Sequence, residues 1–201
     1  MTLFRVLLWA ASVIVFGCTR STVSPPPANM VHTVAVLPPN NRTADPLLVA
    51  GASFLEEYAL RTDRITVPDV LAAEARLQLG RRGFTVVPAD VVDSATQGRA
   101  PGSPQAAAEI ATRGKLDGIV LYIEIRRWEP DVPLRPTSVL VSLTASLVDP
   151  ASGRVLWSAD HPLSPLPTPG SVTAGSAYAT AAQKVMKELL TPLGAERPPA
   201  S

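Results

Sequence analysis

The stretch DGIVLYIEIR, residues 117–126, opens with a turn pair and continues as an apolar run from Ile119 to Ile123. A short apolar run after a turn signal is typical of a buried strand, so we expect both faces of this strand to be covered. The stretch VLVSLTASL, residues 139–147, alternates apolar and mainly polar side chains. That alternation predicts a second strand, with one covered face.

Strand and helix signals alternate on both sides of these two stretches. A return strand is expected over residues 154–158, after a turn at 149–153, and a Pro-rich loop over 162–170. The sequence TVPD, residues 66–69, has the form of a capping box and predicts a helix that ends near Gly80. The remaining expected elements are strands at 31–37 and 84–87 and helices at 103–114 and 173–190.

This order of elements predicts an α/β fold, a single domain in which a mixed β-sheet is packed with helices. The strand–helix–strand units at the start favour parallel pairing with right-handed crossovers. In the first helix, Val70, Ala73 and Leu77, with Leu71 and Ala75 alongside, are expected to form one apolar face.

Composition excludes several classes of protein. The chain has 201 residues, which suits about one domain. Its net charge of +1 provides no field to hold a polyanion, and aromatic residues make up only 5%. We therefore expect no nucleic-acid partner. A single cysteine cannot form a disulfide framework or a cysteine-rich metal site within one chain.

The N-terminus has the form of a bacterial export signal. Arg5 precedes an apolar run over residues 6–16, which is too short for a secure membrane span. The run ends in VFGC, residues 15–18, which resembles a lipobox, although Val15 stands where Leu is favoured. We expect cleavage before Cys18 and acylation of this residue with chains such as palmitate. The alternatives are an ordinary secretory signal with a stray cysteine and an uncleaved anchor.

The chain is thus expected to divide into four parts. Residues 1–17 form the lipoprotein signal peptide, and 18–30 carry the lipidated cysteine and a Pro-rich tether that behaves as a semi-rigid spacer. Residues 31–193 form the α/β domain, and 194–201 form a disordered tail. Thr19 follows the cysteine, where an Asp resembles an inner-membrane retention signal. Its absence favours the outer membrane, with the domain facing the periplasm.

The residues that could support chemistry form no convincing set. His32 and His161 lack a second ligand at metal-binding spacing, so we expect no metal site. Asp160-His161 could join a serine in a triad, but nothing selects that serine. Asp90 and Asp93 lie one turn apart and suit either acid–base work or, more commonly, a helix N-terminus. We expect no cofactor and no enzymatic activity.

Two segments are candidates for a partner surface. Residues 40–66 form a long connection that includes Phe54 and Tyr58, and such loops usually carry function or local structure. This connection is expected to be either a lid packed on the core or an interface. Arg126, Arg127 and Trp128 join charge and a large aromatic ring at a strand end, a composition that is common at interface hot spots. The alternative is that Trp128 caps the edge of the core.

Four motifs in this order resemble a family of bacterial lipoproteins. They are VAVLPPN at 34–40, RRGFTVVP at 81–88, LDGIVLYI at 116–123, and LVD at 147–149 with GRVLWS at 153–158. The domain they outline is similar to the TolB N-terminal domain, the penicillin-binding-protein activator LpoB and the curli secretion protein CsgG. The resemblance implies a mixed-sheet α/β domain without an active site.

From these observations we expect a lipid-anchored cell-envelope lipoprotein that acts as a non-catalytic protein-binding or accessory domain. Its partners would be the membrane, through lipidated Cys18, and an envelope protein such as a synthase or a transport complex. The alternative is a self-assembling subunit of an envelope export or secretion complex, and hence a homo-oligomer. Pore formation needs additional membrane-crossing hairpins, whereas the one long hairpin expected here is used in the sheet.

Overall fold

The computed structural model describes residues 22–23, 31–50 and 65–194. The expected signal peptide, Cys18, Phe54, Tyr58 and the residues after Gly194 lie outside the described residues. The predictions that concern them stay predictions.

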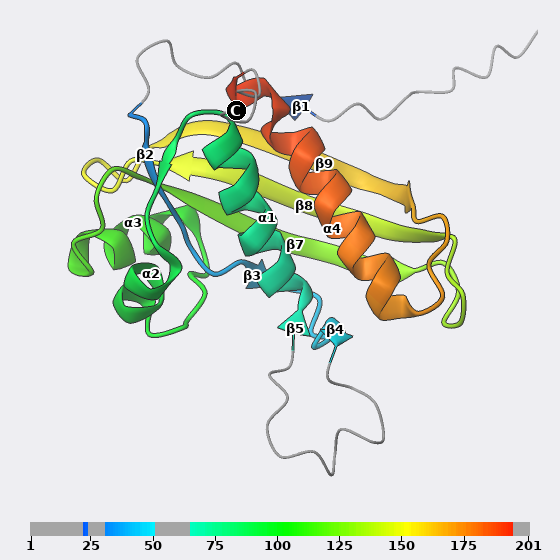
Figure 1. Cartoon of the computed structure of the whole chain (residues 1–201). Coiled ribbons are helices and arrows are strands. Elements are labelled where there is room, and N and C mark those ends of the chain that lie inside the picture. The colour runs from blue at the N-terminus through cyan, green and yellow to red at the C-terminus, as the bar shows by residue number, and fades with distance from the viewer. Residues whose placement is uncertain (1–21, 24–30, 51–64, 195–201) are drawn as a thin grey trace, which may run out of the picture.

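A mixed β-sheet forms the centre of the domain (Figure 1). Its strand order is β1-β9-β8-β7-β2-β6, and β3 lies alongside β7. Strand β2 pairs in parallel with both β6 and β7, whereas β7, β8 and β9 form an antiparallel meander. The strands are β1 (Thr22–Val23), β2 (Thr33–Val36), β3 (Asn40–Asn41), β6 (Thr85–Val86), β7 (Ile119–Pro130), β8 (Ser138–Val148) and β9 (Val155–Pro167).

Helices pack on both faces of this sheet. They are α1 (Val67–Arg81), α2 (Ala89–Thr96), α3 (Pro104–Arg113), α4 (Ala174–Leu190) and a final 3-10 turn (Thr191–Leu193). A small antiparallel pair, β4 (Leu48–Ala50) and β5 (Ile65–Thr66), lies beside the start of α1. The predicted single-domain α/β fold with a mixed sheet is confirmed, including the parallel pairing of the first strands.

The helix starts follow from local sequence. Thr66 accepts a hydrogen bond from the backbone N–H of Asp69, and the Asp69 carboxylate accepts the Thr66 N–H at 2.8 Å. This is the predicted capping box, and it satisfies backbone donors that the first turn leaves free. Ser103 and Thr173 cap α3 and α4 in the same way, through the backbone N–H groups of Ala106 and Ser176.

The predicted apolar face of α1 is right in part. The helix buries Leu71 and Ala75, as expected, together with Leu79. Ala73 and Leu77 were also expected to face the core, but Ala73 is exposed and Leu77 is 47% exposed. Helical spacing alone does not determine where the buried face of a helix ends. The buried set is determined by packing, because α1 lies on the sheet and contacts α4 beside it on the same face.

Strand β9 is longer than expected. The predicted Pro-rich loop at 162–170 is wrong, because β9 continues to Pro167 and pairs with β8 as far as Ser138. Past Asp160, no described strand pairs with the outer edge of β9. Proline lacks an N–H donor, and it is tolerated in edge strands because no neighbour needs that donor. The structure also contains helix α2, which was not among the elements expected from the sequence.

The two faces of the sheet are covered unequally. Helices α1 and α4 lie along the first face, and the large core beneath them includes Leu121, Leu143 and Val185. Helices α2 and α3 pack on the second face through a smaller core that includes Ala35, Ala111 and Tyr122. This core reaches only the start of β7 and the end of β8, so the far part of the second face carries no described helix.

Candidate functional site

The uncovered part of the second face presents polar side chains from three strands. We call this surface the open face, and we define it by Glu124, Arg126, Arg127, Ser142, Thr144, Ser158 and Asp160. The register places these residues between core-facing neighbours, for example Thr144 between Leu143 and Ala145. Because strand side chains alternate between faces, such residues project away from the large core.

A β-bulge places two arginines on the open face. The register between β7 and β8 shifts between Ile125 and Arg127, so that Arg127 lies opposite Ser142. Arg126 is the extra residue, and its guanidinium contacts Thr144 and Asp160 on the same face. A bulge re-aims side chains in this way and is common next to functional sites. Without it, the two arginines would point to opposite faces of the sheet.

Hydrogen bonds hold Arg126 across the meander. Its Nη2 donates to Thr144 Oγ1 at 2.7 Å and also contacts the Asp160 carboxylate. Thr144 Oγ1 in turn donates to Asp160 Oδ1 at 2.9 Å. Arg127 instead donates to Glu129 at 2.7 Å, and both of these side chains are about half exposed. Exposed ion pairs of this kind contribute at most about 1 kcal/mol to stability, so little free energy is lost when a partner replaces them. The side chains of the open face are therefore positioned but available for contacts.

A second polar cluster lies where the open face meets α3. Tyr122 OH donates to Glu124 Oε2 at 2.9 Å and accepts from Asn40 Nδ2 at 3.3 Å. Arg42 lies 3.6 Å from the same carboxylate. Burial raises the pKa of Tyr122, and the hydrogen bond to Glu124 acts in the same direction. Tyr122 is therefore a fixed donor that positions Glu124 at the rim.

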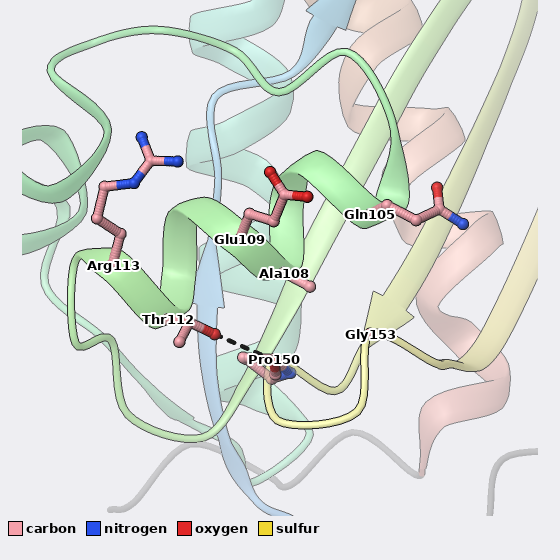
Figure 2. Close-up of a pocket in the computed structure, with 7 residues that line it drawn as sticks. All are labelled: Gln105, Ala108, Glu109, Thr112, Arg113, Pro150 and Gly153. Carbon is pink, nitrogen blue, oxygen red and sulfur yellow. Dashed lines mark hydrogen bonds between the residues drawn. The ribbon is translucent and has the colours of Figure 1, made fainter.

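A surface groove of about 600 Å³ lies between α3 and the β8–β9 turn. Figure 2 shows its lining residues on the two walls, with Thr112 donating to the Pro150 carbonyl oxygen at 3.1 Å. The lining residues are Gln105, Ala108, Glu109, Thr112, Arg113, Pro150 and Gly153. Arg113 also lines two smaller hollows along α2 and α3. The groove offers charge, amide and methyl contacts, and the Thr112 hydroxyl in its lining is engaged by the Pro150 carbonyl oxygen.

The structure separates the predicted partner residues. Arg126 and Arg127 lie on the open face, whereas Trp128 is 1% exposed and packs edge-on against Tyr178 of α4 at 6.4 Å between ring centroids. The alternative interpretation of Trp128, a residue at the edge of the core, describes its position. The sequence did not connect Thr144 or Asp160 with Arg126, whose network they complete. In the sequence, these two residues are marked only by the alternation of polar and apolar side chains along β8 and β9. The pairing register of the strands is needed to place them beside Arg126.

The residues considered for catalysis do not converge. Asp160 faces the open surface, whereas its neighbour His161 is buried on the other side of β9. Adjacent strand residues point to opposite faces, so these two cannot act on one substrate. Asp90 and Asp93 are exposed on α2, and His32 packs against Phe84 at 5.8 Å between ring centroids. Within the described ranges, no group of three His, Cys, Asp or Glu residues could hold a metal ion.

Two further observations concern the described residues. None of their helices combines the length and apolarity needed to cross a bilayer. The buried polar atoms without a hydrogen-bond partner include Trp128 Nε1, Trp157 Nε1, His161 Nδ1 and Thr168 Oγ1. Most buried polar groups in proteins are paired, so these positions are sites where a polar atom costs stability.

Comparison with known proteins gives a fold but no family. No protein-family model matches the sequence, and no curated protein matches it. Among solved structures, the PelC dodecamer from Paraburkholderia phytofirmans aligns with 89% of this chain and 99% of its own, at 19% identity and a TM-score of 0.53. The chain has the fold of PelC.

Two other solved structures are similar over shorter stretches. A lipoprotein from Neisseria meningitidis aligns with 76% of this chain and 96% of its own, at 19% identity and a TM-score of 0.45. LpoB from E. coli aligns with 71% of this chain and 61% of its own, at 20% identity and a TM-score of 0.42. At these identities, the likeness to PelC establishes a common fold and nothing about activity.

Proposed function

We propose that this protein is a lipid-anchored component of the bacterial cell envelope, without catalytic activity, that binds a protein partner through the open face. The sequence VFGC, residues 15–18, supports the anchor, because a small residue before a cysteine follows an export-type apolar run. Acyl chains on Cys18 would hold the chain at a membrane without a spanning helix. The absence of Asp at position 19 favours the outer membrane, with the domain in the periplasm.

The observation that carries the binding role is the unequal covering of the sheet. Helices α1 and α4 seal the first face, whereas α2 and α3 leave the open face with two arginines, two carboxylates and several hydroxyls. Arginine is a frequent anchor of protein interfaces, and Arg126 is held in place here by Thr144 and Asp160. The side chains of Ser142, Thr144 and Ser158 are short, so a partner can approach the backbone of the sheet closely.

The anchor and the open face act together. A domain held near a membrane explores a thin layer, which raises its effective concentration for a partner in the same layer. Strand β1 begins four residues after Cys18, so an acylated Cys18 would hold the domain close to the membrane. A modest interface on the open face is then sufficient for stable association.

The anchor is tested by replacing Cys18 with Ala in the full-length chain and separating membranes from soluble periplasmic contents. We expect Cys18→Ala to leave the outer-membrane fraction while keeping the far-ultraviolet circular dichroism of the wild type. Thr19→Ala is the matched control, and it should remain in the membrane. A Cys18→Ala protein that stays in the outer membrane would disprove the lipid anchor.

Self-assembly is the second candidate function, and the likeness to PelC favours it. PelC was solved as a dodecamer, and its fold covers 89% of this chain. A ring needs two different surfaces on each subunit, one of which would be the open face. Native mass spectrometry of the detergent-extracted protein tests this idea. A closed oligomer that dissociates in Arg127→Glu but not in Leu77→Glu would support self-assembly, and a monomer at every concentration would oppose it.

A further inference from the structure

One end of the meander carries apolar side chains that point into solvent. The loop between β7 and β8, residues 131–137, and the loop between β9 and α4, residues 168–173, lie side by side at this end (Figure 1). The backbone N–H of Thr168 donates to the Thr137 carbonyl oxygen at 2.8 Å and ties the two loops together. Leu134 is 84% exposed, Val172 is 70% exposed and Val132 is 44% exposed. We call Val132, Leu134 and Val172 the apolar tip.

The apolar tip is held in place and has few charges around it. Asp131 accepts hydrogen bonds from the N–H groups of Val132 and Thr137 at 2.9 and 3.0 Å, which fixes the base of the first loop. From Pro162 to Gln183 the chain contains no Asp, Glu, Lys or Arg. Arg135 stands next to Leu134 and is exposed. The charges of the first loop are Asp131, which is tied down at its base, and Arg135 beside Leu134. Such an apolar end suits a lipid surface, where the arginine can keep its charge in the headgroups.

The direction of β1 relates this end to the N-terminus. Strand β1 runs antiparallel to β9, with Thr22 opposite Asp160 and Val23 opposite Ala159. The chain therefore enters β1 from the side of β9 that leads to the apolar tip. Cys18 precedes Thr22 by four residues, which span at most about 14 Å when fully extended.

The reach of this segment sets a limit on where the acyl chains can be. From Asp160 to Pro167, β9 advances seven residues, or roughly 23 Å at ~3.3 Å per residue. The four residues from Cys18 to Thr22 are shorter than this stretch of β9. Cys18 therefore cannot lie beyond the apolar tip along the strand direction. When the strands stand upright on the membrane, a bilayer that contains these acyl chains also meets the apolar tip.

We propose that the apolar tip inserts into the headgroup region of the membrane and forms a second lipid contact beside the acylated Cys18. This inference rests on the lipid anchor of the proposed function. Side chains in an amphipathic surface element penetrate about 5–10 Å into the boundary of headgroups and acyl chains, which is deep enough for a leucine and two valines. Two contacts fix the orientation of the domain, so the strands rise from the membrane and the open face is turned sideways toward neighbours in the same layer.

The test measures the depth of a label at the tip. The full-length chain with Leu134→Cys is acylated in cells, purified and placed in vesicles of phosphatidylethanolamine and phosphatidylglycerol. Acylation blocks the Cys18 sulfur, so an environment-sensitive dye attaches at position 134. The matched control is Val91→Cys on α2, which is 46% exposed and lies at the other end of the sheet. Vesicles that float in a density gradient are then compared with and without brominated lipid.

We expect brominated lipid to quench most of the emission at position 134 and to leave the emission at position 91 unchanged. Leu134→Asp should also speed transfer of the acylated protein between vesicles by about tenfold, whereas Val91→Asp should not, because an exposed leucine gains apolar burial only in the membrane. Floating protein whose label is equally accessible to water at both positions would overturn the tip contact alone. A blue-shifted label at position 134 without lipid quenching would indicate a protein contact instead and would also overturn it. Protein that fails to float would overturn both the tip contact and the anchor.

Discussion

Replacing Trp128 with Ala distinguishes a core residue from an interface residue. Trp128 is 1% exposed, lies in the core beneath α4 and makes an edge-to-face contact with Tyr178. Removing a buried Trp side chain costs about 3–5 kcal/mol, part of which is the aromatic contact. For a domain of this size, each kcal/mol lowers the melting temperature by ~2–4 °C, so we expect a fall of about 6–20 °C.

Circular dichroism during heating and urea titration measures this loss. Arg127→Ala is the matched control, because the Arg127 side chain is next to Trp128 in the chain but exposed. The free energy of unfolding of this variant should change by no more than about 0.5 kcal/mol. Trp128→Phe should cost less than Trp128→Ala, since the indole N–H has no hydrogen-bond partner to lose. A Trp128→Ala protein that melts like the wild type but no longer captures its partner would refute the core assignment.

Three further predictions concern the described residues. Gly118→Ala should destabilise the domain or prevent folding, because a Cβ there would lie 2.2 Å from the Thr33 carbonyl oxygen and the glycine has a φ of +78°; soluble yield and a thermal melt test this. The hydrogen bond from Thr137 holds the pKa of Asp131 below its ordinary value of 3.8, so the carboxylate stabilises its loop at higher pH and this contribution is lost as the pH falls below that value. Hydrogen exchange at the loop amides, divided by the intrinsic rate at each pH, should show a loss of protection there in the wild type, and the same loss in Asp131→Asn would contradict the assignment. Thr168→Val should leave the stability unchanged or raise it by about 1 kcal/mol, because the buried hydroxyl has no partner; a large loss on urea titration would show that the hydroxyl is satisfied.

Local chemistry made several elements predictable. The capping box at Thr66, the helices expected at 103–114 and 173–190, and the alternation over residues 139–147 depend on neighbours in the sequence, and the structure reproduces each of them. The mixed sheet followed from the order of these elements.

The features that differed from expectation depend on distant contacts. β9 extends past Asp160 because it is an edge strand that tolerates prolines, which local sequence cannot reveal. The buried face of α1 is selected by α4, and the inward position of Trp128 is set by the bulge between Ile125 and Arg127. The same bulge brings Arg126 and Arg127 to the open face together, and the sequence indicated neither the bulge nor the partners of Arg126.

The central claim is that a lipid-anchored domain presents the open face to a protein partner. A photoreactive residue at Arg127 of the full-length acylated chain, activated in cells and followed by mass spectrometry, tests it most directly. The same residue at Leu77, on the outer side of α1, is the control. We predict a discrete crosslinked species from position 127, either with another envelope protein or with a second copy of this chain, and none from position 77. Equal crosslinking from both positions, or none from position 127, would contradict the account.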